Sequence, residues 1–234
     1  EHVQVAVVLN NMASAMLTMR ESAQALPLFE RVLRIRERAF GPNSVQLVSV
    51  LNNMGSALIS EQDFAGAERQ LERARALLEA QFPEGHPHLG SALLNLGMLH
   101  SSQGHLAEAR GLYEQSLAIW ERTLGPEHPK VALALDNLGS LARREERPRA
   151  AIELFRRALA IREAALGSDH PMVGSLLVHL GSALLDVGDA RSARPLLERA
   201  ERISQALQED DPELPGSVAS AMGRLLLVEG KAGR

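Results

Sequence analysis

The sequence repeats itself with a period of about 42 residues, the interval that separates Gly55 from Gly97. One small residue marks the period on every repeat, at Ala13, Gly55, Gly97, Gly139, Gly181 and Gly223. A second small position keeps the same spacing, at Ala25, Ala67, Ala109, Ala151 and Ala193. A fixed period of this length is typical of stacked helical arrays, in which each repeat buries its apolar face only against its neighbours.

Each repeat contains two helical patterns separated by a short polar turn. In the second repeat these patterns cover about 45–60 and about 63–80, with apolar residues at i, i+3 or i+4, and i+7. Short turns force consecutive helices to pack antiparallel. We therefore predict an all-α array of five repeats plus the first helix of a sixth. The expected repeat bounds are about 1–43, 44–85, 86–127, 128–169, 170–212 and 213–234.

These repeats are expected to form one domain over 1–234. Because the sequence starts and stops inside a repeat, we interpret it as a piece of a longer protein. Glycine inside a helix costs about 1 kcal/mol relative to alanine, so its recurrence at Gly55 and Gly97 needs a reason. We expect the glycine series to meet the alanine series of the second helix in small-on-small contacts.

The loops between repeats carry their own signals. In the segment 124–129 (LGPEHP), Gly125 follows one helix and Pro129 precedes the next. Glycine at such a position is expected to form a left-handed cap, and proline suits a first helical residue because its missing N–H would be unpaired there. The histidine before the proline also recurs, at His86, His128 and His170. Neighbouring helices lie about 8–10 Å apart, so histidines a full repeat apart cannot share a metal ion, and we expect them to cap helices.

Composition and motifs exclude several function classes. The 25 basic and 29 acidic residues are interspersed and give a net charge of −4, which offers no footprint for nucleic acid or an anionic membrane. The absence of cysteine excludes thiolate chemistry, and no apolar run approaches the ~18–20 residues of a membrane span. The segment 223–232 lacks the spacing of a phosphate loop. We expect a cytoplasmic protein that has no cofactor and is not an enzyme.

The apolar and small residues of the two helices, such as Leu51, Gly55 and Ala67, resemble the tetratricopeptide repeat, whose usual length is about 34 residues. The phrases LNNMG and LGPEHP resemble its kinesin-light-chain subtype. The resemblance covers the whole chain and implies a right-handed superhelical solenoid. Its first helices would line a concave groove that holds peptides, often through an Asn two residues before the small position.

That resemblance and the chemistry of the side chains select the candidate residues. An amide offers donors and an acceptor that match a peptide unit, so one amide per repeat can hold an extended backbone. The alternative is a structural role, in which these amides bond backbone between repeats. For the basic pair on the fourth repeat, the alternative is a solvated face. The candidates are Asn10, Asn11, Asn52, Asn53, Ser56, Asn95, Met98, Asp136, Asn137, Ser140, Arg143, Arg144 and His179.

The expected function is a protein–protein interaction scaffold that binds a peptide or protein segment in this groove. Two alternatives stay open. The array would be a regulatory arm docked inside a larger signalling protein, such as a kinase or an NTPase. Otherwise it would be an element that assembles end to end, as a homo-oligomer, through its incomplete terminal repeats.

Overall fold

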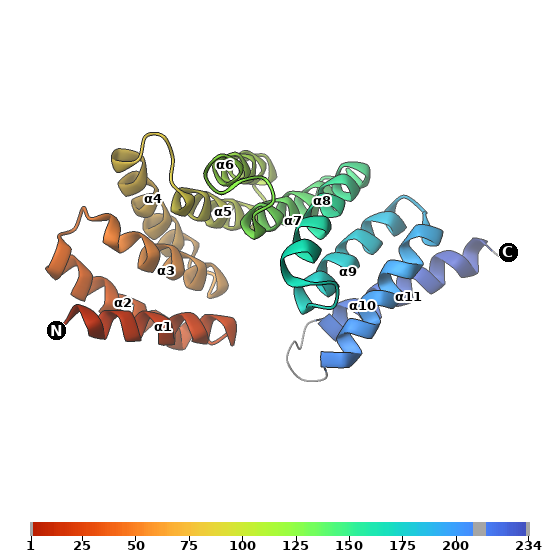
Figure 1. Cartoon of the computed structure of the whole chain (residues 1–234), viewed down its shortest axis with the longest axis horizontal. Coiled ribbons are helices and arrows are strands. Elements are labelled where there is room, and N and C mark those ends of the chain that lie inside the picture. Colours follow the sequence, from red (N-terminus) through yellow and green to blue (C-terminus); the bar gives the residue numbers. More distant parts are fainter. Residues whose placement is uncertain (1, 208–213, 233–234) are drawn as a thin grey trace. The chain divides into compact units, whose positions relative to one another are not determined.

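The computed structural model describes residues 2–207 and 214–232 of the chain, and within those residues all regular structure is helical (Figure 1). A short 3-10 helix, η1 (Val45–Leu47), leads into α3. The α-helices are α1 (Val3–Thr18), α2 (Ser22–Phe40), α3 (Val48–Ser60), α4 (Phe64–Gln81), α5 (Pro87–Ser102), α6 (Leu106–Leu124), α7 (Pro129–Arg144), α8 (Pro148–Leu166), α9 (Pro171–Asp186), α10 (Ala190–Leu207) and α11 (Leu214–Ala232). Consecutive helices pack in pairs from α1–α2 to α9–α10, and α11 begins a sixth repeat. The all-α repeat architecture is therefore confirmed.

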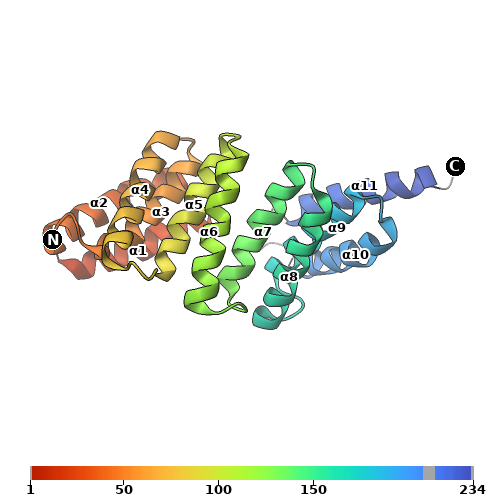
Figure 2. The same cartoon turned by 90° about the horizontal axis from the view of Figure 1, so that it is seen from above.

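The chain forms two compact units, Glu1–Leu124 with α1–α6 and Gly125–Arg234 with α7–α11. Within the N-terminal unit, the first helices of successive repeats contact one another, α1 with α3 and α3 with α5. Within the C-terminal unit, α7 contacts α9 and α9 contacts α11 (Figure 2). A single domain over 1–234 stays a prediction, and the repeat boundary expected at 212–213 lies outside the described residues.

The recurrent glycine of the first helix is a seat for a bulky side chain of the second helix. A Cβ atom built on Gly97 would lie 2.5 Å from Cε1 of Tyr113, and one built on Gly139 would lie 2.6 Å from Cε1 of Phe155. Leu71 and Leu197 fill the seats at Gly55 and Gly181 in the same way.

The expectation of small-on-small contacts holds only in part, since the backbone oxygen of Ala109 lies 3.3 Å from the Cβ built on Gly97, whereas the nearest atoms belong to a bulky side chain. The residue that fills the seat lies one helical turn beyond the alanine of the same helix, as Phe155 lies beyond Ala151. Ala151 and its equivalents are fully buried beside these contacts. The two helices do approach closely, and the nearest atoms to the glycine belong to a large side chain of the second helix.

Two glycines that end second helices, Gly41 and Gly167, have a conformation that differs from the expected left-handed cap. Gly41 has φ 83° and ψ 161°, and Gly167 has φ 84° and ψ 163°. A left-handed helical residue has ψ near +47°, so these glycines lie instead in an extended region that is essentially closed to other residues. The chain consequently leaves the second helix in an extended direction toward the next repeat.

The recurrent histidines cap the first helices, as the sequence predicted. The Nδ1 atom accepts the backbone N–H two residues further on, at 3.1 Å for His86, 3.1 Å for His128 and 3.2 Å for His170. Proline follows each of these histidines as the first helical residue. Because Nδ1 accepts, the neutral ring carries its proton on Nε2.

Loss of one histidine cap should destabilise the C-terminal unit. His128→Ala removes the acceptor for the N–H of Lys130, so we expect the free energy of unfolding in urea to fall by about 0.5–2 kcal/mol. His128→Asn supplies a side-chain oxygen at the same place and should recover most of that loss. Equal losses in the two variants would show that the cap contributes nothing and that the ring acts by packing.

Candidate functional site

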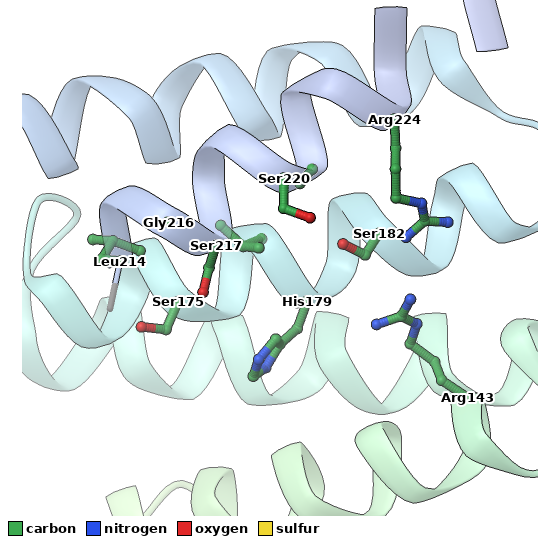
Figure 3. Close-up of a pocket in the computed structure, with 11 residues that line it drawn as sticks. Arg143, Ser175, His179, Ser182, Leu214, Gly216, Ser217, Ser220 and Arg224 are labelled. Carbon is green, nitrogen blue, oxygen red and sulfur yellow. The ribbon is translucent and has the colours of Figure 1, made fainter. Parts of the chain in front are cut away.

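A pocket of about 600 Å³ opens in the C-terminal unit, and all residues that line it come from the three first helices α7, α9 and α11. Figure 3 shows the guanidinium groups of Arg143 and Arg224 extending toward the same space, beside Ser182. No acidic side chain lines the pocket among the described residues. Its polar lining is Arg143, Ser175, His179, Ser182, Ser217, Ser220 and Arg224.

A carboxylate at the end of α9 holds the two arginines. Asp186 accepts a hydrogen bond from Nε of Arg143 at 2.7 Å and another from Nη2 of Arg224 at 2.5 Å. Burial alone would raise the pKa of Asp186, but the two hydrogen bonds and the two positive charges outweigh it and lower that pKa below its usual value. This ion bridge ties α7, α9 and α11 together at one edge of the pocket.

The ion bridge should add stability only where Asp186 is ionised. A carboxyl group whose pKa is lowered by folding stabilises the folded state above its unfolded pKa, and this contribution disappears as the pH falls through the folded pKa. We expect wild type to exceed Asp186→Asn in urea stability at pH 6, and the difference to shrink below about pH 4. A difference that grew on acidification would contradict the assigned partners of Asp186.

A second polar contact joins α7 and α9. Nδ1 of His179 lies 2.7 Å from Oδ1 of Asp136, and the His179 ring lies 5.5 Å, centroid to centroid, from the Phe155 ring. Arg162 of α8 is 5% exposed; burial lowers its pKa, and the charge of Asp136 opposes that change. Two of the predicted site residues, Asp136 and His179, are thus brought together, and the phenyl ring that fills the Gly139 seat lies next to the imidazole.

The asparagines of the N-terminal unit lie along the seams between neighbouring first helices. Nδ2 of Asn95 donates to the backbone oxygen of Asn52 at 3.3 Å, and Nδ2 of Asn53 donates to Oγ of Ser14 at 3.2 Å. Nδ2 of Asn52 reaches the backbone oxygen of His88 at 3.5 Å. Such contacts between repeats are those expected if the amides have a structural role. Each of them uses one N–H of an amide that has two.

The remaining predicted residues do not converge on one place. Asn137 turns back on its own helix, where Nδ2 donates to the backbone oxygen of Leu133 at 2.9 Å. Asn11 and Arg144 are exposed, whereas Arg143 bridges to Asp186 and so is not simply a solvated charge. The other members, all half-buried, are Asn10, Ser56, Met98 and Ser140.

Several pocket residues were missed by sequence reasoning, although the period contained a signal for some of them. Ser182 and Arg224 occupy the same place in the fifth and sixth repeats as Ser140 occupies in the fourth. The change from serine to arginine at position 224 marks the sixth repeat as different. Asp186 carried no such signal, because its partners lie on three helices that only folding brings together.

Comparison with known proteins identifies the family. The model of the tetratricopeptide repeat family matches residues 4–80, 88–164 and 150–206. The chain therefore belongs to the tetratricopeptide repeat family, which agrees with the resemblance read from its repeats. Sequence comparison with curated proteins gives no match.

Solved structures share the fold at low identity. A putative kinesin light chain of Podosopora anserina with nearly identical TPR-like repeats is 23% identical, covers 89% of this chain and 98% of its own, and has a TM-score of 0.68. BtubC (BKLC) from P. vanneervenii is 21% identical, and the match covers 90% of this chain and 85% of BtubC with a TM-score of 0.73. The Rap conjugation gene regulator of plasmid pLS20, solved in complex with the Phr* peptide, is 13% identical. The match covers 84% of this chain and 52% of the regulator, with a TM-score of 0.70.

Neither a candidate metal site nor a candidate membrane span occurs in the described part of the chain. Among those residues, no group of three or more His, Cys, Asp or Glu side chains could hold a metal ion. None of the helices there combines the length and the apolar composition that a membrane span requires.

Proposed function

We propose that this chain is a protein–protein interaction scaffold that binds an extended segment of a partner protein across its first helices. The pocket between α7, α9 and α11 is the main contact in this proposal. The observation that carries it is that every lining residue comes from a first helix, while the second helices α8 and α10 contribute none. Such a pocket meets a segment lying across successive repeats.

The comparisons support the proposal at the level of the fold. The Rap regulator of plasmid pLS20 was solved with a bound peptide, and its likeness to this chain has a TM-score of 0.70. At 13% identity that likeness concerns the fold alone. Peptide binding by this chain is therefore part of the proposal. No reaction is proposed, since a partner segment needs shape, hydrogen bonds and charge from the scaffold but no chemical step.

The asparagines of the first helices make additional contacts in the proposal. In Asn53 and Asn95, one N–H joins neighbouring helices, and the second N–H and the oxygen would meet the backbone of a partner segment on the first helices of the N-terminal unit. A variant with Asn53, Asn95 and Asn137 changed to Ala is expected to lose about 0.5–1.5 kcal/mol of stability for each lost hydrogen bond. It should also bind the partner segment more weakly, while its helicity by circular dichroism stays unchanged. If binding is unaffected, the amides are purely structural.

A peptide selection tests the proposal directly. Random peptides displayed on phage are selected on the whole chain, and the affinity of the best synthetic peptide is measured by calorimetry. Ser220→Trp should fill the pocket and abolish that affinity. Ala219→Trp is the matched control, because Ala219 is also exposed, is adjacent on α11 and does not line the pocket.

Selection should therefore yield peptides whose binding is lost in Ser220→Trp and kept in Ala219→Trp, with equal melting temperatures. Two results would overturn the proposal. The first is a selection that enriches no peptide. The second is a set of peptides that bind both variants equally well, because their site would then lie outside the pocket.

A further inference from the structure

The pocket between α7, α9 and α11 carries more positive charge than its internal partner neutralises. Arg143 and Arg224 share the single carboxylate of Asp186. Each arginine uses one nitrogen for that carboxylate, Nε of Arg143 and Nη2 of Arg224. A guanidinium group has five N–H donors in a fixed plane, so both retain donors that can serve a ligand in the pocket. The described lining residues include no acidic side chain, and the carboxylate that a ligand meets is that of Asp186 at the edge.

Hydroxyl groups in the pocket add donors that the protein itself does not use. Ser182 lines the pocket, and its hydroxyl has no hydrogen-bond partner in the described part of the chain. The same holds, over those residues, for Ser217 and Ser220 on the facing helix α11, and Figure 3 shows Ser220 pointing toward Ser182. These three serines line the pocket, so their hydroxyl groups can donate to an oxyanion that lies beside the two arginines.

We propose that this pocket binds a phosphoryl group carried by the partner segment. The inference rests on the proposed function for the segment and names its chemistry. Arg143 and Arg224 hold two of the phosphoryl oxygens, and the hydroxyl of Ser182 donates to the third. A phosphorylated side chain carries three strong acceptor oxygens and about −1.5 to −2 charges at neutral pH, which is enough to compete with the single charge of Asp186 for the two guanidinium groups.

Charge distinguishes phosphate from carboxylate in this pocket. Asp186 already supplies one negative charge to the two arginines. A ligand carboxylate carries the same single charge and therefore gains little by competing with a carboxylate that is tethered in place. A phosphate dianion carries about twice that charge and forms charge-assisted hydrogen bonds with both guanidinium groups. Asp186 thereby acts as an internal competitor that selects against weakly charged groups.

The test uses inorganic phosphate as the probe. The Nε–Hε resonances of Arg143 and Arg224 are followed by NMR in the whole chain at pH 7.5 during titration with phosphate, acetate and sodium chloride at matched ionic strength. Phosphate should shift both resonances in a saturable way, with acetate binding about 10-fold or more weakly. Sodium chloride should shift neither resonance. Equal responses to phosphate and acetate, or no saturable response to phosphate, would overturn the proposal.

Three variants sharpen the test. Arg224→Gln should abolish the phosphate response of Arg143. Arg199→Gln is the control, because Arg199 forms an ion pair of the same kind with Glu163 outside the pocket, and it should leave the response unchanged. Asp186→Asn removes the competitor and should tighten phosphate binding several-fold. Weaker binding in Asp186→Asn, or loss of the response in Arg199→Gln, would contradict the assigned roles.

Failure of this inference can be told apart from failure of the proposed function. If library-selected peptides bind in the pocket but phosphate does not, the scaffold proposal stands and the phosphoryl group is wrong. If phosphate binds but no peptide does, the ligand is a free phosphate or another phosphorylated molecule, and the inference of a phosphorylated partner segment fails. Comparison of one selected peptide with and without a phosphoserine completes the experiment, with tighter binding expected for the phosphorylated form.

Discussion

Replacing Gly97 by leucine is expected to destabilise the chain by about 1–3 kcal/mol or more, because the new side chain overpacks an occupied seat. A Cβ atom at this position would already lie 2.5 Å from the ring of Tyr113 and 3.3 Å from the backbone oxygen of Ala109. The ring can move only by disturbing a core in which Tyr113 is 3% exposed. The measurement is the free energy of unfolding in urea.

The matched control for this prediction is Gly223→Leu. Gly223 occupies the same register in the sixth repeat, but apart from its chain neighbours and the nearby backbone of α11 no described atom lies within 4 Å of a Cβ built there. We expect Gly223→Leu to be neutral or to stabilise α11 by up to about 1 kcal/mol, because leucine has the higher helix propensity. Equal destabilisation of both variants would show that glycine is required for a reason other than the seat.

Truncation of the residue that fills a seat should have the largest effect of all. Phe155 is fully buried against Gly139, and Phe155→Ala is expected to cost about 3–5 kcal/mol, the usual range for removing a buried phenyl ring. The loss should appear in urea unfolding of the C-terminal unit. It should also broaden the His179 ring resonances, since that ring packs 5.5 Å from the phenyl ring.

Leucine at the same position separates the size of the side chain from its aromatic character. Leu71 and Leu197 fill equivalent seats in other repeats, so Phe155→Leu should cost clearly less than Phe155→Ala, with a loss nearer to about 1 kcal/mol. If the two variants lose equal stability, the specific ring contact with His179 matters more than filling the seat.

The repeat period predicted the architecture because residues that recur at a fixed interval make the same packing contacts in each repeat. A glycine that recurs inside the first helix of successive repeats is destabilising by itself, so close contact with another helix had to follow. The sequence could not say what makes that contact. Tyr113, Phe155 and Leu197 differ in type, and only the folded helices show that each lies over the glycine of its own repeat.

The candidate site could be predicted only in part, for a related reason. Arg143 and His179 were selected from the first-helix register, and both line the pocket. The asparagines were selected by the same register, yet Asn53 and Asn95 bond neighbouring first helices. Register fixes the helix and the approximate face of a residue. Whether its side chain turns toward the next helix or toward the open pocket depends on neighbours from other repeats, such as Asp186 and Arg224.

The central claim is that a partner segment binds to the first helices of the C-terminal unit. The most direct measurement is a crystal structure of the whole chain with a library-selected peptide. We expect the peptide to lie across α7, α9 and α11, with one of its side chains in the pocket between Arg143 and Arg224. A peptide seated instead on the second helices α8 and α10, with the pocket empty, would contradict the claim.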